Sequence, residues 1–198
     1  MDAVTIANFA LARIRSANFI EDLGESSTEA QICKIHYELA RDLLLGAAAW
    51  PFAVRRAVLN QTGTPPPEWA YSYAIPRDCL RLLRIADNRR RTPADERIAY
   101  AIENNGADDR VLLTDQQEAT LIYVARIENV NLFAADFVEA LSWRLAAFIA
   151  SPLSASEELQ KTALETAFAL QNVAAANHYN QTQDDPPPDP ELYNLRTC

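Results

Sequence analysis

Few side chains in this sequence are spaced for chemistry. Cys33 and His36 stand at i and i+3 in a segment with helical periodicity, which places two metal ligands on one side of a helix. Two ligands do not complete a metal site, and no further ligand is specified, so we prefer a buried cysteine beside an interfacial histidine. The adjacent acids Asp108-Asp109 and Asp184-Asp185 have the form of paired carboxylates for acid–base work, but in polar loops we expect them to be solvated.

The standard catalytic and nucleotide-binding motifs are missing from the sequence: it has no GxSxG, GxGxxG, Walker loop, HExxH or CxxC. Its four glycines are few for loops that cradle phosphate groups. The three cysteines are an odd number, which argues against a disulfide framework. We therefore expect no enzyme, no cofactor and no metal site.

Composition and charge fit a folded protein that does not bind nucleic acid tightly. Of the 198 residues, 49% are hydrophobic and 23% are charged, and the formal net charge is −9. The single basic cluster is Arg89, Arg90 and Arg91. We interpret it as an exposed tip between two strands, with contact to a protein partner as the next choice and contact to DNA phosphates after that. No secretory signal and no apolar stretch long enough for a bilayer are present, so we expect a soluble protein made in a cytosol.

The first quarter of the sequence predicts two helices within residues 2–50. Asp2 is placed to cap the first, and a capping box at Ser26-x-x-Glu29 precedes the second, which ends near Trp50 because Pro51 follows. For the second helix we predict one apolar stripe, with Glu38, Arg41 and Asp42 on the surface. The stripe consists of Ile32, Ile35, Leu39, Leu43 and Ala47.

Two further helices are predicted within residues 134–179, separated by Ser151-Pro152 and a second capping box at Ser154-x-x-Glu157. The first of them carries apolar residues at helical spacing, namely Phe137, Leu141, Leu145 and Phe148. The second is rich in alanine, which permits close approach of another helix.

The middle of the chain, residues 52–127, predicts short strands and a turn at Asn105-Gly106. The strand candidates are 52–59, 69–75, 80–86, 98–103, 111–114 and 119–127. We therefore predict an α+β fold, mainly α: a bundle of two N-terminal and two C-terminal helices with an inserted small antiparallel β-sheet, forming one domain over residues 1–180. The aromatic residues of this region are expected in the core or at a subunit interface. They are Trp50, Phe52, Trp69, Tyr71 and Tyr73.

Residues 181–198 differ in composition from the rest, because the prolines between residues 186 and 190 exclude a helix and favour an extended polyproline-like form. We expect this segment to be an arm that docks on a partner, with the alternative that Tyr193 and Leu195 fold back on their own domain. The residues of the arm that we expect to make contact are Pro186, Pro187, Pro188, Leu192, Tyr193 and Leu195.

Three segments, taken in order, resemble the tail tubular protein A family, the head-to-tail adaptors of short-tailed bacteriophages. The first is Trp50-Pro51-Phe52-Ala53-x-Arg55-x-Ala57-x-Leu59 at the end of a long helix. The second is Pro67-x-Trp69-x-Tyr71-x-Tyr73-x-x-Pro76-x-Asp78-Cys79-Leu80-Arg81. The third is Phe137-x-Glu139-Ala140-Leu141-x-x-x-Leu145-Ala146. The similarity covers about residues 1–180 in order and spacing.

The resemblance implies a structural protein of the virion neck, assembled in the host cytoplasm, in which about twelve copies form a ring. The ring would join the portal protein to a tail nozzle similar to tail tubular protein B, with tail fibres as a further candidate partner. The genome would pass through its acidic channel without specific binding. The arm would then dock on the portal, or as second choice on an adjacent adaptor subunit. The alternatives are a neck or connector protein of a long-tailed phage, a peptidoglycan-cleaving tail component, and a cytosolic helical regulator.

Overall fold

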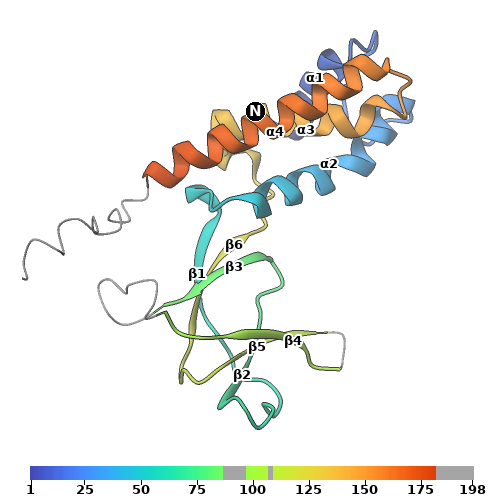
Figure 1. The fold of residues 1–198 in the computed structure, drawn as a ribbon. Helices are drawn as coiled ribbons and strands as arrows, with labels where there is room; N and C mark the ends of the chain where they lie inside the picture. Colours follow the sequence, from blue (N-terminus) through green and yellow to red (C-terminus); the bar gives the residue numbers. More distant parts are fainter. Residues whose placement is uncertain (87–96, 107–108, 182–198) are drawn as a thin grey trace, which may run out of the picture.

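A layer of helices lies beside a β region in this protein (Figure 1). The computed structural model describes residues 1–86, 97–106 and 109–181. The helices are α1 (Ala3–Arg13), α2 (Thr28–Ala47), α3 (Ala135–Ala150) and α4 (Glu157–Gln181). The described residues thus form a mixed α/β fold in which the β region is inserted between α2 and α3, as the sequence predicts.

Helix α3 is the centre of the helical layer and contacts α1, α2 and α4. Phe137, Leu141 and Leu145, three of the four residues of its predicted apolar stripe, are completely buried, while Phe148 near its end is partly exposed. Three helices cover α3, so its buried residues are found on more than one side of the helix and extend beyond a single apolar stripe.

The N-terminal cap of α1 is the predicted one, but α2 and α4 are capped by serines other than the predicted ones. Asp2 caps α1 as predicted, since its carboxylate accepts a hydrogen bond from the Thr5 amide. Helix α2 is capped by Ser27, one residue after the predicted Ser26, through a 3.2 Å hydrogen bond from the Ala30 amide to the Ser27 hydroxyl. At the start of α4 the hydroxyl of Ser156, two residues after the predicted Ser154, accepts from the backbone of the first turn. Both predicted capping boxes are therefore wrong in register.

Six strands form two antiparallel sheets of three strands each, where we predicted one sheet. The first sheet has the order β1 (Val54–Val58), β6 (Thr120–Ala125), β3 (Cys79–Ile85). The second has the order β2 (Tyr71–Ala74), β5 (Arg110–Thr114), β4 (Ala101–Asn104). The division follows from the short link between β5 and β6, where Glu118 has a φ of 55° and turns the chain, so that the two strands take different partners.

The predicted turn at Asn105-Gly106 is confirmed, because it follows β4 where that strand pairs with β5 in antiparallel register. Gly106 has a φ of 79°, in the left-handed region that glycine tolerates. The Asn105 amide donates to the Asp109 carbonyl at 3.0 Å across this turn.

Candidate interaction surface

An aromatic cluster fills the junction where α2 passes into β1. Trp50 is completely buried, and its indole Nε1–H donates a 2.8 Å hydrogen bond to the Leu44 carbonyl in the last turn of α2. The Phe137 ring on α3 meets Trp50 edge-on at 4.9 Å and Phe52 at 5.1 Å between ring centroids. This contact fixes the start of the β region against the central helix, with the edge-to-face geometry that aromatic pairs prefer.

Charged side chains tie α2 to the first sheet beside this cluster. Asp42 accepts from Arg126 Nε at 2.7 Å, and Arg81 Nη1 donates to the Ala47 carbonyl at 3.0 Å. The second contact satisfies a carbonyl at the C-terminal end of α2, where a cation is also favoured by the helix dipole. The helical layer and the first sheet are thus joined at two separate places on α2.

Asp78 holds the strands of the first sheet together. Its carboxylate accepts from Arg55 Nη1 at 2.8 Å and from the Tyr123 hydroxyl at 3.1 Å. Burial of Tyr123, followed by the nearby negative charge of Asp78, raises the pKa of the phenol above its ordinary value. Arg55 and Asp78 belong to two of the three segments that carry the family resemblance, and Phe137 belongs to the third.

The five aromatic residues predicted as one set lie in two places. Trp50 and Phe52 are at the junction, whereas Trp69, Tyr71 and Tyr73 belong to the second sheet and the loop before it. Tyr73 is buried and its hydroxyl donates to the Gln116 carbonyl at 2.9 Å, while Trp69 and Tyr71 are partly exposed. Trp50 and Tyr73 therefore confirm the prediction of core positions.

Of the residues considered for chemistry, Cys33 and His36 do not form a reactive site, and Asp108, Asp184 and Asp185 lie outside the described residues. Cys33 is completely buried, and burial raises the pKa of its thiol to about 11, so the thiolate is disfavoured at neutral pH. His36 is partly exposed and its ring lies 6.1 Å from the Phe148 ring. Over the described ranges, no three His, Cys, Asp or Glu side chains come close enough to hold a metal ion.

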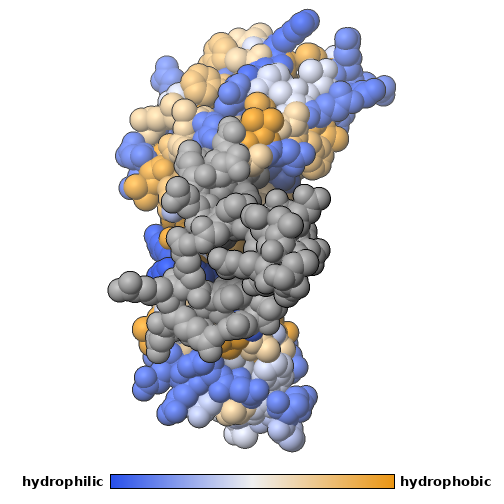
Figure 2. All heavy atoms as spheres, turned by 60° about the vertical axis from the view of Figure 1, so that its left-hand side comes forward, coloured by the Kyte–Doolittle hydropathy of each residue, from blue (hydrophilic) through white to orange (hydrophobic). Residues whose placement is uncertain are grey.

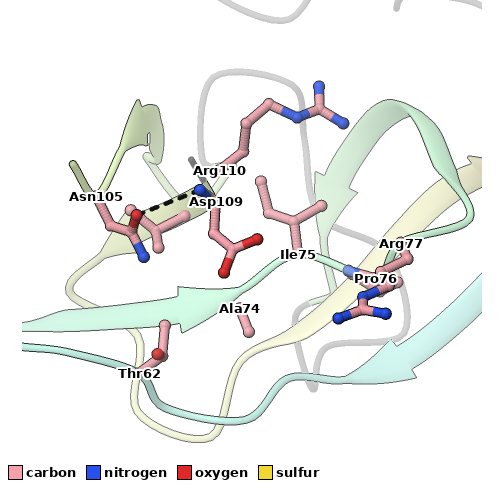
Figure 3. Close-up of a pocket in the computed structure, with 9 residues that line it drawn as sticks. Thr62, Ala74, Ile75, Pro76, Arg77, Asn105, Asp109 and Arg110 are labelled. Carbon is pink, nitrogen blue, oxygen red and sulfur yellow. Dashed lines mark hydrogen bonds between the residues drawn. The ribbon is translucent and has the colours of Figure 1, made fainter. Parts of the chain in front are cut away.

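A hollow of about 340 Å³ lies at the edge of the second sheet, beside the β4–β5 turn (Figure 3). It is lined by Asp109, Arg110 and Arg77, together with Ile75 and Pro76. In Figure 3 the Arg110 side chain extends away from the Asp109 carboxylate, so the charged groups do not converge on one point. The Asp109 amide is already bonded to the Asn105 side chain. The hollow does not offer the convergent polar groups that fix a small ligand.

Three of the five residues of the apolar stripe that we predicted on α2 are exposed, while Ile32 and Ala47 are partly buried. Ile35, Leu39 and Leu43 have 71%, 53% and 44% of their surface accessible. The predicted surface residue Arg41 is instead buried beside Asp42, at 2.8 Å from its carboxylate. The buried side of α2 consists of Ala30, Cys33, Tyr37, Ala40, Arg41, Leu44 and Leu45. The prediction chose the wrong one of two apolar stripes on the same helix.

The exposed apolar surface continues from α2 across α3 to α4. His36 of α2 contacts Phe148 of α3, and Arg144, one turn before Phe148, donates a hydrogen bond to the Gln171 side chain of α4. Leu164 and Phe168, which precede Gln171 at helical spacing, are 47% and 51% exposed. We call this surface the outer helical face. It comprises Ile35, Leu39 and Leu43 of α2, Arg144 and Phe148 of α3, and Leu164 and Phe168 of α4. Hydrophobic residues are visible among hydrophilic ones on the helical half in Figure 2.

Arg144 is the one cation of the outer helical face. Its Nε is buried, and neither an acceptor for Nε nor a carboxylate within ion-pair distance of the guanidinium occurs among the residues that the structure describes. Burial lowers the pKa of Arg144 below its ordinary value, but an arginine keeps its charge at physiological pH. Among the described residues, this cation and the apolar side chains around it are therefore incompletely satisfied.

Two groups of predicted contact residues lie outside the described residues. They are the basic cluster Arg89, Arg90 and Arg91, and the C-terminal arm with Pro186, Pro187, Pro188, Leu192, Tyr193 and Leu195. Their predicted contacts therefore stay predictions.

Comparison of the sequence with models of known protein families found no match, and comparison with curated proteins found none either. Within the described part of the chain, no helix combines the length and the apolar character needed to cross a bilayer.

Leu164, Phe168 and Arg144 were not predicted to lie together on one surface. The only signal in the sequence is that α2 and α4 each carry more apolar residues than one buried stripe uses. On α4 the buried side consists mainly of Ala163, Ala167 and Ala174, so the larger Leu164 and Phe168 are left to point outward.

Proposed function

We propose that the chain is a structural head-to-tail adaptor of a bacteriophage. In this proposal about twelve copies form a ring that joins the portal to the tail nozzle and lines the channel through which DNA passes. The observation that carries the proposal is the outer helical face, a set of large apolar side chains on three helices that a single chain leaves exposed. Apolar patches of this kind mark protein–protein interaction sites.

The location of the three resembling segments supports the same proposal. The first and third meet at the junction through the Trp50–Phe137 contact, and the end of the second is tied to the first by the Arg55–Asp78 ion pair, while its aromatic part lies in the second sheet. Residues spread over about ninety positions of the sequence are thus accounted for by one structural task, holding the sheet at a set angle to the helices. A subunit that passes force between two other rings needs such a stiff connection.

The charge of the chain fits the channel wall in this proposal. With a formal net charge of −9 per chain, a ring repels DNA phosphates and lets the genome slide past. The hollow beside the β4–β5 turn lacks converging polar groups, so the described surface favours contact with proteins over chemistry on a small ligand.

The test is the particle mass of the purified full-length chain, measured with and without its cognate portal protein, followed by imaging of any large species. A closed ring, alone or on the portal, is the expected result. A monomer or closed dimer that ignores the portal would overturn the proposal and favour a cytosolic regulator. Cleavage of purified peptidoglycan by the chain would instead identify a cell-wall-degrading tail component.

A further inference from the structure

The outer helical face lacks two things that a binding partner can supply. Leu39 and Phe168 are about half exposed, and among the described residues no carboxylate lies within ion-pair distance of the Arg144 guanidinium, whose Nε has no acceptor. An occupant that fits must therefore combine apolar side chains with acidic ones over a short length of chain.

The chain itself contains such a segment after the end of α4. Residues 182–198 include the acids Asp184, Asp185, Asp189 and Glu191, followed by the apolar residues Leu192, Tyr193 and Leu195. Arg196 is the only basic residue of the segment, so its net charge is opposite to that of Arg144. At about 3 Å per residue in a polyproline-like form, the segment spans on the order of 50 Å, long enough to cross all three helices.

The direction of α4 decides between the chain's own face and that of a neighbour. Helix α4 continues from Gln171, next to Arg144, to Gln181, about 15 Å farther along its axis. Figure 1 shows this end of α4 pointing away from the other helices. To return to its own Arg144 the chain has to reverse direction shortly after residue 181, whereas the run Pro186-Pro187-Pro188 favours a stiff, extended course.

We propose that residues 182–198 of one copy bind the outer helical face of a neighbouring copy, with an acidic side chain of the segment on Arg144 and its Leu and Tyr side chains on the apolar residues around it. This inference rests on the proposed ring, since it requires neighbours. It chooses the adjacent subunit over the portal as the partner of the arm. The contact repeats from each copy to the next in one direction, which is the head-to-tail type of contact that closes a ring.

Cys198 provides a probe for this contact in the natural chain. The other two cysteines, Cys33 and Cys79, are buried and burial raises the pKa of both thiols to about 11, so a maleimide reagent selects Cys198. A benzophenone maleimide on Cys198 is activated by light in a mixture of unlabelled chains and chains labelled with ¹⁵N, with portal added if the ring requires it. Mass spectrometry then gives the crosslinked residues and shows whether they belong to the same copy.

The expected result is crosslinking between two copies, on α2, α3 or α4. Arg144→Gln, which removes the charge, should lower the yield about tenfold, as expected for loss of a charge-assisted hydrogen bond. The matched control Arg56→Gln, at an exposed site on β1, should leave the yield unchanged.

Crosslinks within one copy, on the β region or on the portal would overturn the inference, as would equal effects of the two variants. The particle mass of the same samples separates the two proposals. A ring whose crosslinks lie elsewhere refutes the docking of the arm alone, whereas a chain that stays monomeric with portal present refutes the ring and the docking together.

Discussion

Replacing Leu39 by alanine should weaken assembly and leave the isolated subunit intact. Leu39 is 53% exposed, whereas Leu44 on the same helix is 1% exposed and packs in the core. Full burial of a leucine is worth about 1.5–3 kcal/mol, so the exposed half of Leu39 can contribute about 1 kcal/mol at each subunit contact. That energy corresponds to about a fivefold change in the subunit concentration at which assembly is half complete.

The matched control is Leu44→Ala. It should lower the free energy of unfolding of the dilute subunit by about 2–5 kcal/mol, because it leaves a cavity. Leu39→Ala should change that free energy by less than about 0.5 kcal/mol. Unfolding is followed by denaturant titration of dilute protein, and assembly by mass measurement over a concentration series.

Two results would refute this argument. Equal destabilisation of the subunit by the two substitutions would mean that Leu39 lies in the core and that the stripe on α2 faces inward after all. A stable Leu39→Ala subunit that assembles at the same concentration as the natural chain would remove Leu39 from the interface.

Three further predictions concern contacts within the subunit. Asp42→Asn should lower the free energy of unfolding by about 1–2 kcal/mol, because it removes the charge that pairs with Arg41 and Arg126. Glu38→Gln, at an exposed site of α2, should not lower it, and equal thermal shifts would contradict this. Burial raises the pKa of the Cys33 thiol from 9.0 to about 11, so its stabilising effect is complete below pH 9 and is lost as the pH rises to 11. Stability measured over that range should fall by about 2–3 kcal/mol less in Cys33→Ala than in the natural chain, and parallel curves would exclude the thiol as the cause. Tyr73→Phe should cost about 1 kcal/mol in denaturant unfolding by removing a hydroxyl that donates to a backbone carbonyl, and an unchanged midpoint would show that water replaces this bond.

Local patterns in the sequence located the helices and strands but not the surfaces that face one another. Asp2 and Gly106 act on their immediate neighbours and have the roles that the sequence predicts, whereas α2 ends at Ala47, before Pro51, which instead begins a short 3-10 turn. Which side of α2 faces the core depends on its contacts with α1 and α3, and these contacts are not encoded in the sequence of α2 itself. Both of its apolar stripes have helical spacing, so periodicity alone does not choose between them.

Neither the junction nor the outer helical face could be predicted from the sequence, because both depend on contacts between distant segments. Trp50 and Phe137 come from opposite ends of the β region, and no local pattern in either segment predicts that these two residues are in contact. Arg144 could not be singled out from the sequence, because its distinguishing property is the lack of an ion-pair partner among the described residues, which only the structure gives.

The pairing of β1 with β6 also has a consequence for how the chain folds. Val54, which begins β1, lies opposite Val124 near the end of β6, so the chain enters and leaves the β region on neighbouring strands. Once these two strands have paired, α2 and α3 are separated by about 18 residues of effective loop instead of about ninety. This shortening lowers the entropy cost of bringing the helices together by about 1–2 kcal/mol. We therefore expect the long-range contact between α2 and α3 to form after the first sheet closes, whereas α3 and α4, which are neighbours in the sequence, can pair independently. The second sheet lies within the segment that the β1–β6 pairing closes, so a longer loop in that sheet should slow this closure only slightly, since doubling a loop costs about 0.6 kcal/mol.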